Sequence, residues 1–288
     1  MATLREIRRR ISSIRSTQQI TKAMKMVAAA KLRKAQENIL ATRPYADKLS
    51  ATIGHLMARI ENWQDPLLRT RPVEKVLIVI VTADRGLCGA FNSNIIRRAE
   101  SLIKSYEDLE VYLYLIGKKC SEYFSRRNYQ IFAQKTHFFN QLNFNDALEI
   151  MSRLSQSYQQ EQFDKIEVVY NQFKSAIQQT LVVEKILPFT PDESMQKESS
   201  QIDFIYEPSK EGILQMIIPK HLNVQMWKIL LESNAAEQGA RMTAMESATE
   251  NAEELIAYLS LTYNRARQAA ITKEISEIVG GAEALKEQ

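Results

Sequence analysis

Residues 14–34 read IRSTQQITKAMKMVAAAKLRK, a stretch without glycine, proline or any acidic side chain. Such a composition favours a helix. Extending it in both directions gives one set of positions spaced alternately by three and four: Leu4, Ile7, Ile11, Ile14, Gln18, Thr21, Lys25, Ala28, Leu32, Ala35 and Ile39. This spacing predicts a helix that packs along another helix over many turns, with a seam that is polar in its middle.

The predicted helix runs from Leu4 to Leu56, about 80 Å at 1.5 Å per residue, and Pro44 could kink it. A second helical pattern covers the C-terminal end, from about Ser209 to Leu285, roughly 90 to 110 Å. Its apolar stripe drifts by one position, as expected of a straight helix rather than a strict heptad. The stripe comprises Ile256, Leu259, Tyr263, Ala266 and Ala270, then Ile271, Ile275 and Ile278.

Between the two helices the pattern changes to apolar runs that predict strands, at residues 76–82, 111–117, 129–134, 165–173 and 179–189. Helical stretches at residues 93–105, 118–127 and 144–160 separate the first four runs. This alternation predicts a parallel sheet with right-handed crossovers, and the last two runs could form an antiparallel edge. Residues 191–201 resemble a polar linker.

The fold class expected is α/β plus a long antiparallel two-helix coiled coil formed by the N- and C-terminal helices. The helices should run antiparallel because both join the same central domain. In this antiparallel pair we expect Met24 to lie near Tyr263. The predicted division is an N-terminal coiled-coil helix at 1–58, an α/β Rossmann-like domain at 73–190 and a C-terminal coiled-coil helix at 209–288.

The distribution of charge indicates what the basic helix faces. The net charge is only +4, but residues 5–34 contain ten basic residues and one acid, Glu6. The C-terminal third leans acidic, which favours pairing of the two ends. A basic helix could neutralise phosphates or serve as a transit peptide. However, it lacks interleaved aromatic residues, and its pattern continues without a break to about Leu56, so a protein-facing helix is the preferred interpretation.

Motifs for bond chemistry are sparse. Cys88 and Cys120 have no CxxC spacing and indicate two reduced thiols. The turn TADRGLCGAFN at residues 82–92 could offer glycine N–H groups to a phosphate. Its spacing matches neither the dinucleotide nor the P-loop motif, so a tight packed turn is preferred. The three histidines lie far apart, and no nucleophile elbow or acid pair occurs. The sequence therefore indicates no enzyme, no cofactor and no metal site.

Several of these segments together resemble the gamma subunit family of the rotary F-type ATP synthases, in its bacterial type. The resemblance covers essentially the whole chain. The matching segments are ITKAMKMVAAAKLRKAQ at 20–36, RPYA at 43–46, the turn at 82–92, LESNAAEQGARMTAM at 231–245 and YNRARQAAITKEISEIVGGAEAL at 263–285.

The resemblance implies a rotor shaft that couples ion-driven rotation of the membrane c-ring to conformational cycling of the catalytic beta subunits. Implied partners are the alpha, beta and epsilon subunits and the c-ring, with no nucleic acid and no membrane insertion. The implied location is the cytoplasmic face of the bacterial inner membrane. The implied partner contacts are Met24, Lys25, Arg267, Gln268, Thr272 and Glu274 along the shaft, and Tyr206 and Glu207 at its foot. The alternative is a free-standing coiled coil that binds nucleic acid or acts as a scaffold.

Overall fold

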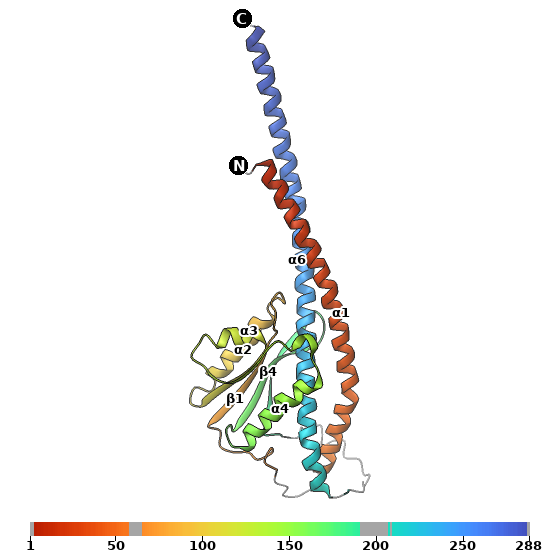
Figure 1. Ribbon diagram of the computed structural model, residues 1–288, viewed down its shortest axis with the longest axis vertical. Coiled ribbons are helices and arrows are strands. Elements are labelled where there is room, and N and C mark those ends of the chain that lie inside the picture. The colour runs from red at the N-terminus through yellow and green to blue at the C-terminus, as the bar shows by residue number, and fades with distance from the viewer. Residues whose placement is uncertain (1–2, 58–64, 191–206, 208, 287–288) are drawn as a thin grey trace. The chain divides into compact units, whose positions relative to one another are not determined.

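The computed structural model describes residues 3–57, 65–190, 207 and 209–286 of the chain (Figure 1). The chain divides into two compact units. A helical unit contains residues up to Val27 and those from Met242 onward, and a sheet unit contains Ala28–Arg241. Two long helices, α1 (Leu4–Met57) and α6 (Lys210–Lys286), each contribute to both units, and α1 continues through Pro44. Residues 191–201, predicted as a linker, lie outside the described residues. Whether the predicted three-part division holds as separate domains stays a prediction.

The sheet unit contains a five-stranded sheet in the order β3-β2-β1-β4-β5. Its strands are β1 (Lys75–Val81), β2 (Glu110–Ile116), β3 (Gln130–Lys135), β4 (Lys165–Phe173) and β5 (Gln179–Leu187). Strand β1 pairs in parallel with β2 and β4, β2 pairs in parallel with β3, and β5 runs antiparallel to β4. The predicted strands, their parallel pairing and the antiparallel edge are therefore confirmed.

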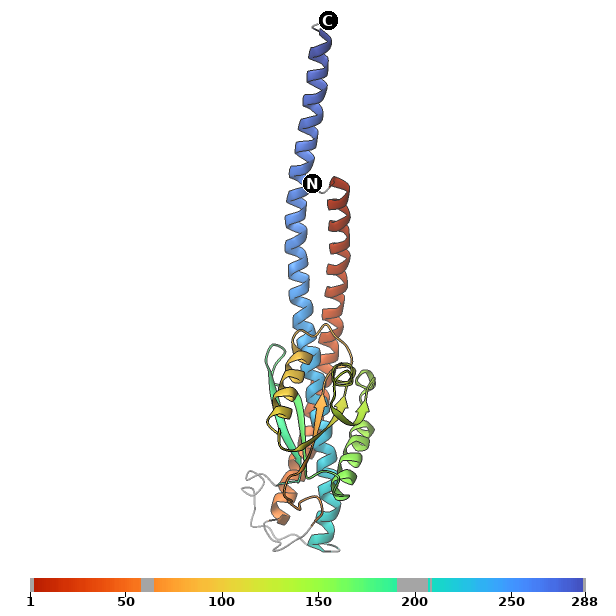
Figure 2. The same cartoon turned by 90° about the vertical axis from the view of Figure 1, so that its left-hand side faces the viewer.

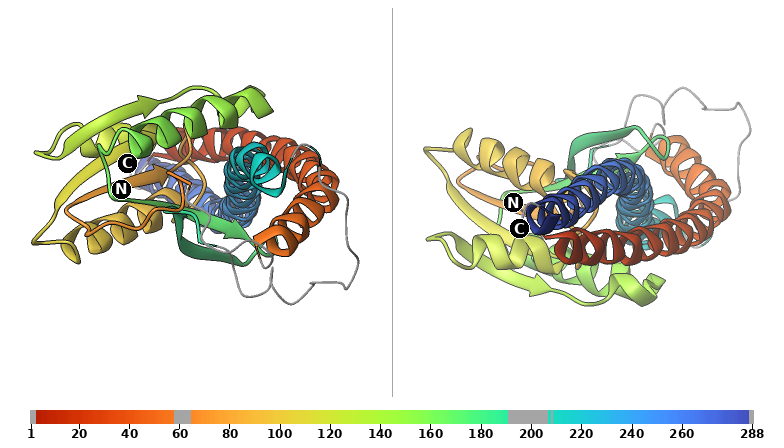
Figure 3. Two further views of the ribbon diagram at one scale, coloured as in Figure 1. Left: turned by 90° about the horizontal axis from the view of Figure 1, so that it is seen from below. Right: turned by 90° about the horizontal axis from the view of Figure 1, so that it is seen from above.

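Helices lie on both faces of this sheet because side chains alternate along each strand. Helices α2 (Phe91–Lys104) and α3 (Lys118–Phe124) cover the face to which Val76, Ile78 and Ile80 point. The other face packs against α4 (Phe144–Gln159) and the sheet-unit parts of α1 and α6. Figure 3 shows α4 on the opposite side of the strands from α2 and α3. A short 3-10 turn, η1 (Phe139–Gln141), precedes α4 and was not expected from the sequence.

In the helical unit, the start of α1 lies alongside α6 in both side views (Figures 1 and 2). Every seam position of α1 from Leu4 to Lys25 is buried or half-buried, and apart from Met24 all its other described residues up to Val27 are exposed. The predicted seam is therefore confirmed. Oγ1 of Thr21 lies 2.7 Å from Oγ1 of Thr249, and Nζ of Lys25 lies 2.5 Å from Oε1 of Glu246. Because the number rises on α1 as it falls on α6, the helices run antiparallel.

The seam on α6 contains the stripe expected from the sequence and extends it toward the N-terminus of the helix. Covered positions follow alternating steps of four and three through the paired region: Met245, Thr249, Ala252, Ile256, Leu259, Tyr263 and Ala266. The predicted stripe from Ile256 to Ala266 is therefore confirmed, and its predicted drift begins only at Ile271, beyond the last covered position, so the covered region keeps the spacing of a heptad. The expected stripe began only at Ile256, because Thr249 and Ala252 are not strongly apolar and did not stand out in the sequence. The drifting residues from Ile271 onward are exposed.

The register gives a direct test of the helical unit. We expect Thr21→Cys combined with Thr249→Cys to form a disulfide within one chain, because the two hydroxyls already touch and a disulfide needs Cβ atoms about 4 Å apart. The pair proposed from the sequence, Met24 with Tyr263, is wrong: Tyr263 lies about 16 residues, or roughly 24 Å, beyond the position opposite Met24.

Mass spectrometry of the proteolysed, non-reduced protein measures this link. The Met24→Cys/Tyr263→Cys variant is the matched control and should stay reduced. The two native thiols are free and buried, so they do not compete. Linked peptides from two chains only, or a link in the control alone, would contradict the register.

Candidate partner-binding surfaces

The first surface predicted to bind a partner includes Met24 and Lys25 on α1. Met24 is half-buried in the helical unit. The ammonium of Lys25 forms an ion pair with Glu246 of α6, and the two side chains are 39% and 44% exposed. The charge of Lys25 is therefore balanced within the chain, while enough of it faces outward for a second contact. Contact of either residue with a partner stays a prediction.

The second surface is the C-terminal part of α6. Every residue from Arg267 to Gly280 is exposed. The structure brings four predicted contact residues together on this stretch: Arg267, Gln268, Thr272 and Glu274. Thr272 donates its hydroxyl to the Gln268 carbonyl at 2.9 Å, a local bond that leaves the side chain of Gln268 facing outward. Among the described carboxylates, none forms an ion pair with Arg267.

This same stretch carries large apolar side chains that the described chain does not cover. Ile271, Ile275, Ile278 and Val279 are between 48% and 67% exposed. Exposed apolar side chains that follow one another along a helix mark an interaction surface, because a soluble surface rarely presents them in a contiguous row. The C-terminal part of α6 is therefore a candidate surface for binding a partner protein.

The third predicted surface is the foot, at Tyr206 and Glu207. Tyr206 lies outside the described residues, and Glu207 is exposed. The structure therefore adds only the exposure of Glu207 to this prediction.

The carboxyl end of the sheet is where open α/β folds usually bind ligands, at the point where strand order reverses. Here the reversal falls between β1 and β4, and α6 packs against the loops that follow both strands. Arg241 donates to the Gly86 carbonyl at 3.1 Å and to Glu237 at 2.6 Å. A Cβ on Gly239 would lie 3.1 Å from the Ala176 carbonyl oxygen. The chain itself therefore occupies this place.

The turn at residues 82–92 is held by its own polar groups. Oδ1 of Asp84 accepts from the backbone N–H of Lys118 at 3.0 Å and of His137 at 2.9 Å. Oδ1 of Asn92 accepts from Ala83 N–H at 2.9 Å. These bonds, together with the packing of α6, support the interpretation of a tight packed turn.

Sequence reasoning missed the role of two charged residues in the LESNAAEQGARMTAM segment. Glu237 and Arg241 are one turn apart and nearly buried, with side chains 7% and 10% exposed. Burial raises the pKa of Glu237, and the Arg241 guanidinium beside it opposes that rise. The spacing of four on a helix is the signal that could have identified this pair. The pair fixes α6 to the turn after β1.

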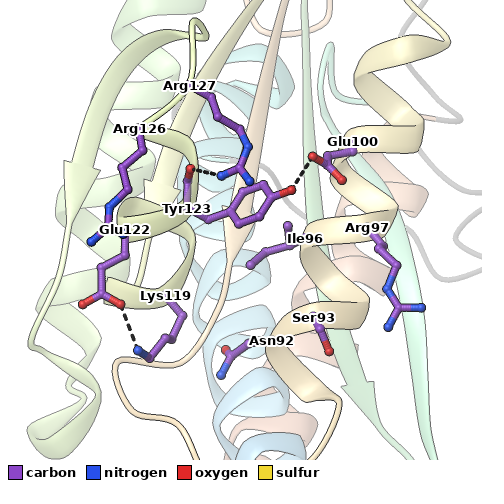
Figure 4. Close-up of a pocket in the computed structure, with 10 residues that line it drawn as sticks. All are labelled: Asn92, Ser93, Ile96, Arg97, Glu100, Lys119, Glu122, Tyr123, Arg126 and Arg127. Atoms are coloured by element: carbon purple, nitrogen blue, oxygen red, sulfur yellow. Dashed lines mark hydrogen bonds and ion pairs between the residues drawn. The ribbon is translucent and has the colours of Figure 1, made fainter.

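A groove on the outer side of α2 and α3 has a volume of about 860 Å³ (Figure 4). We define this α2–α3 groove by its lining residues: Asn92, Ser93, Ile96, Arg97, Glu100, Lys119, Glu122, Tyr123, Arg126 and Arg127. Figure 4 shows that the side chains come from both helices, with Tyr123 and Ile96 between them. Sequence reasoning did not single out this groove, because it depends on how two helices pack.

Comparison with known proteins places this architecture in a class. Among solved structures, the central stalk and c-ring of the Tetrahymena thermophila mitochondrial ATP synthase matches with a TM-score of 0.59 and 27% identity, over 80% of this chain and 99% of that one. The rotor of the Euglena gracilis mitochondrial enzyme matches with a TM-score of 0.68 over 93% and 98%, at 21% identity, and so shares the fold. The chain thus has the fold of a rotary central stalk.

Sequence relatives identify the family. The family model described as ATP synthase matches residues 3–285. The ATP synthase gamma chain of Chloroherpeton thalassium is 51% identical, with 100% of this chain and 99% of the relative covered. That of Chlorobaculum parvum is 50% identical, with 100% of both covered. The chain belongs to the ATP synthase gamma chain family. Its function is that of a central stalk, and the alternative of a free-standing nucleic-acid-binding or scaffold protein is not supported.

Across the part of the chain that the structure describes, each helix is too short or too polar to cross a membrane.

Proposed function

We propose that this chain is the rotating shaft that couples the membrane c-ring to the catalytic beta subunits of an F-type ATP synthase. One observation carries the proposal: residues 267–280 of α6 are exposed throughout and include an uncovered apolar stripe. These exposed apolar side chains require an apolar surface of a partner around them, and a ring of alpha and beta subunits would provide it. The solved relatives are complexes named as rotor, central stalk and c-ring, which supports the same assignment.

The mechanism follows from the asymmetry of the helical unit. Two antiparallel helices of different sequence present a different face in each direction around their axis. Each beta subunit then has its own interaction energy with the shaft, and rotation shifts the conformational equilibrium of the three sites in turn. The shaft performs no bond chemistry in this scheme; it transmits a conformational preference.

The remaining partners follow from the same assignment. We place the epsilon subunit and the c-ring at the foot, near Glu207 and Tyr206. The complex is membrane-associated, with this chain peripheral and on the cytoplasmic face of a bacterial inner membrane. The assignment includes neither nucleic acid nor direct membrane insertion.

The test concerns Arg267 and Gln268. A guanidinium makes strong, charge-assisted contacts with carboxylates, and Arg267 forms no ion pair with the described carboxylates of its own chain. If it holds an acidic beta-subunit loop, Arg267→Ala combined with Gln268→Leu should lower the ATPase rate of the reconstituted complex without lowering its yield. We expect the truncated charged contact to cost roughly 1 to 3 kcal/mol of interaction energy, which corresponds to a fall in rate of about 5-fold to 150-fold.

The matched control is Asn264→Leu combined with Arg265→Ala, which removes one arginine and one side-chain amide three residues earlier on α6. Both of these residues are exposed, and we expect their loss to leave the rate nearly unchanged. If the Arg267/Gln268 variant assembles in normal yield and its complex hydrolyses ATP at an unchanged rate, these residues do not couple the shaft to the conformation of the beta subunits.

A further inference from the structure

The α2–α3 groove has an unequal balance of charge. Its lining contains four basic side chains, Arg97, Lys119, Arg126 and Arg127, against two acids, Glu100 and Glu122. The face of α2 next to it carries a second hollow of about 340 Å³, which Arg97 and Arg98 line. Arginine side chains therefore extend across α2 from one hollow to the other.

Both acids of the groove are already engaged. Glu100 accepts the Tyr123 hydroxyl at 2.7 Å, and Glu122 binds the Lys119 ammonium at 2.8 Å. The bond from Lys119 lowers the pKa of Glu122, which keeps that carboxylate charged and committed to its neighbour. Neither acid is therefore available to balance the arginines fully.

Arg127 is also committed, while two arginines are not. Its guanidinium carbon lies 3.5 Å from the centre of the Tyr123 ring, and Nη1 donates to the Tyr123 carbonyl at 2.7 Å (Figure 4). Arg97 and Arg126 are exposed and, among the described residues, neither forms an ion pair with a carboxylate. Arg97 comes from α2 and Arg126 from the turn that follows α3, and the two guanidinium groups lie on opposite sides of the groove in Figure 4.

We propose that the α2–α3 groove is a docking surface for an acidic helical segment of a partner protein. Guanidinium groups hold carboxylates through paired hydrogen bonds, and clusters of them recognise acidic motifs. Arg97 and Arg126 would take acidic side chains from the two sides, while Ile96 and the edge of Tyr123 would contact apolar ones. The groove is open to solvent and not enclosed, which suits a polypeptide segment better than a small molecule. Because Arg127 covers one face of Tyr123, that ring is a poor platform for a nucleic-acid base.

A fluorophore on Ser93→Cys reports on the groove directly. Ser93 is exposed and lines the groove, and the two native cysteines are buried, so labelling is selective. The probe ligand is a peptide of about 18 residues, roughly 27 Å as a helix, with glutamates flanking leucines on one face. We expect a saturable fluorescence change with the full chain, and a loss of affinity of about tenfold or more when Arg97→Gln and Arg126→Gln remove both charges.

Three controls separate docking from general attraction. A scrambled peptide of the same composition should bind at least several-fold more weakly, because its acids no longer share one face. Arg8→Gln with Arg9→Gln removes the same charge from the exposed face of α1 and should leave the signal unchanged. A single-stranded oligonucleotide should give no saturable change. Equal binding of the scrambled peptide, equal affinity in the Arg97/Arg126 variant, or a response to the oligonucleotide alone would overturn the proposal. These outcomes do not depend on the rotary assignment.

Discussion

Replacing Arg71 by methionine should lower the free energy of unfolding by about 3 to 5 kcal/mol, because removing one partner of a buried ion pair leaves the other charge uncompensated. The Arg71 side chain is only 14% exposed, and its Nε lies 3.4 Å from Oδ1 of Asp164. Its Nη2 donates to the carbonyls of Tyr158 at 3.0 Å and Phe163 at 2.9 Å. The side chain thus connects the segment before β1 to the end of α4 and to the loop between α4 and β4. Methionine preserves much of the volume and removes every one of these bonds.

The matched control is Arg69→Met. Arg69 contacts Glu161 at 3.7 Å, as Arg71 does at 3.2 Å, but the Arg69 side chain is 72% exposed. Exposed ion pairs contribute about 0 to 1 kcal/mol, so this change should be close to neutral. Urea unfolding followed by circular dichroism measures both. If Arg71→Met lowers the free energy of unfolding by no more than Arg69→Met does, the Arg71 contacts do not stabilise the sheet unit.

Gly117→Ala should destabilise the sheet unit by about 3 kcal/mol or more, from backbone strain together with a steric clash. Gly117 follows the last residue of β2 and has a φ of +96°, a backbone conformation that residues other than glycine rarely adopt. A Cβ there would lie 2.1 Å from the carbonyl oxygen of Thr82, which is backbone and cannot rotate aside. The Gly117 N–H also donates to the Lys135 carbonyl at 2.8 Å, so the strand end cannot shift without losing a bond to β3.

Gly86→Ala, in the turn that follows β1, is the control. Nothing lies within 4 Å of a Cβ built at Gly86, and its backbone does not require glycine. Differential scanning calorimetry should therefore find the midpoint of Gly86→Ala close to that of the parent chain, with Gly117→Ala well below both. Similar midpoints for the two variants would mean that β2 accommodates the methyl group.

The sequence predicts the elements well and the connections between them poorly. The run VLIVIV marks β1 because a parallel strand covered on both faces is apolar throughout. The three-and-four spacing identifies the α1 seam even through Thr21 and Lys25, since periodicity survives where hydrophobicity fails. Arg71 has no such signal. Arg71 lies in a loop and donates hydrogen bonds to Tyr158 and Phe163, which follow it by 87 and 92 positions in the sequence. Local sequence patterns carry no information at that separation.

The candidate surfaces divide in the same way. The residues on α6 from Arg267 onward were found through resemblance, and only the structure shows that they share an uncovered stretch of helix. The Glu237–Arg241 pair lay within a quoted segment, yet its burial depends on the turn after β1 packing against α6. The α2–α3 groove depends on the angle between two helices, which no single segment encodes.

The polar layer in the helical unit determines how load passes along the pair. Two helices with purely apolar seams could shift their register by one heptad with little loss of free energy. A helix pair that shifts in this way cannot hold torsional strain. Here such a slip would set Thr21 against Met242 or Ile256, both apolar, and would break its bond to Thr249. A single polar contact at a seam position can fix register in this way, at some expense of stability. The layer of Thr21, Lys25, Glu246 and Thr249 therefore locks the register of the two helices and resists axial shear at the end of the helical unit near Val27 and Met242.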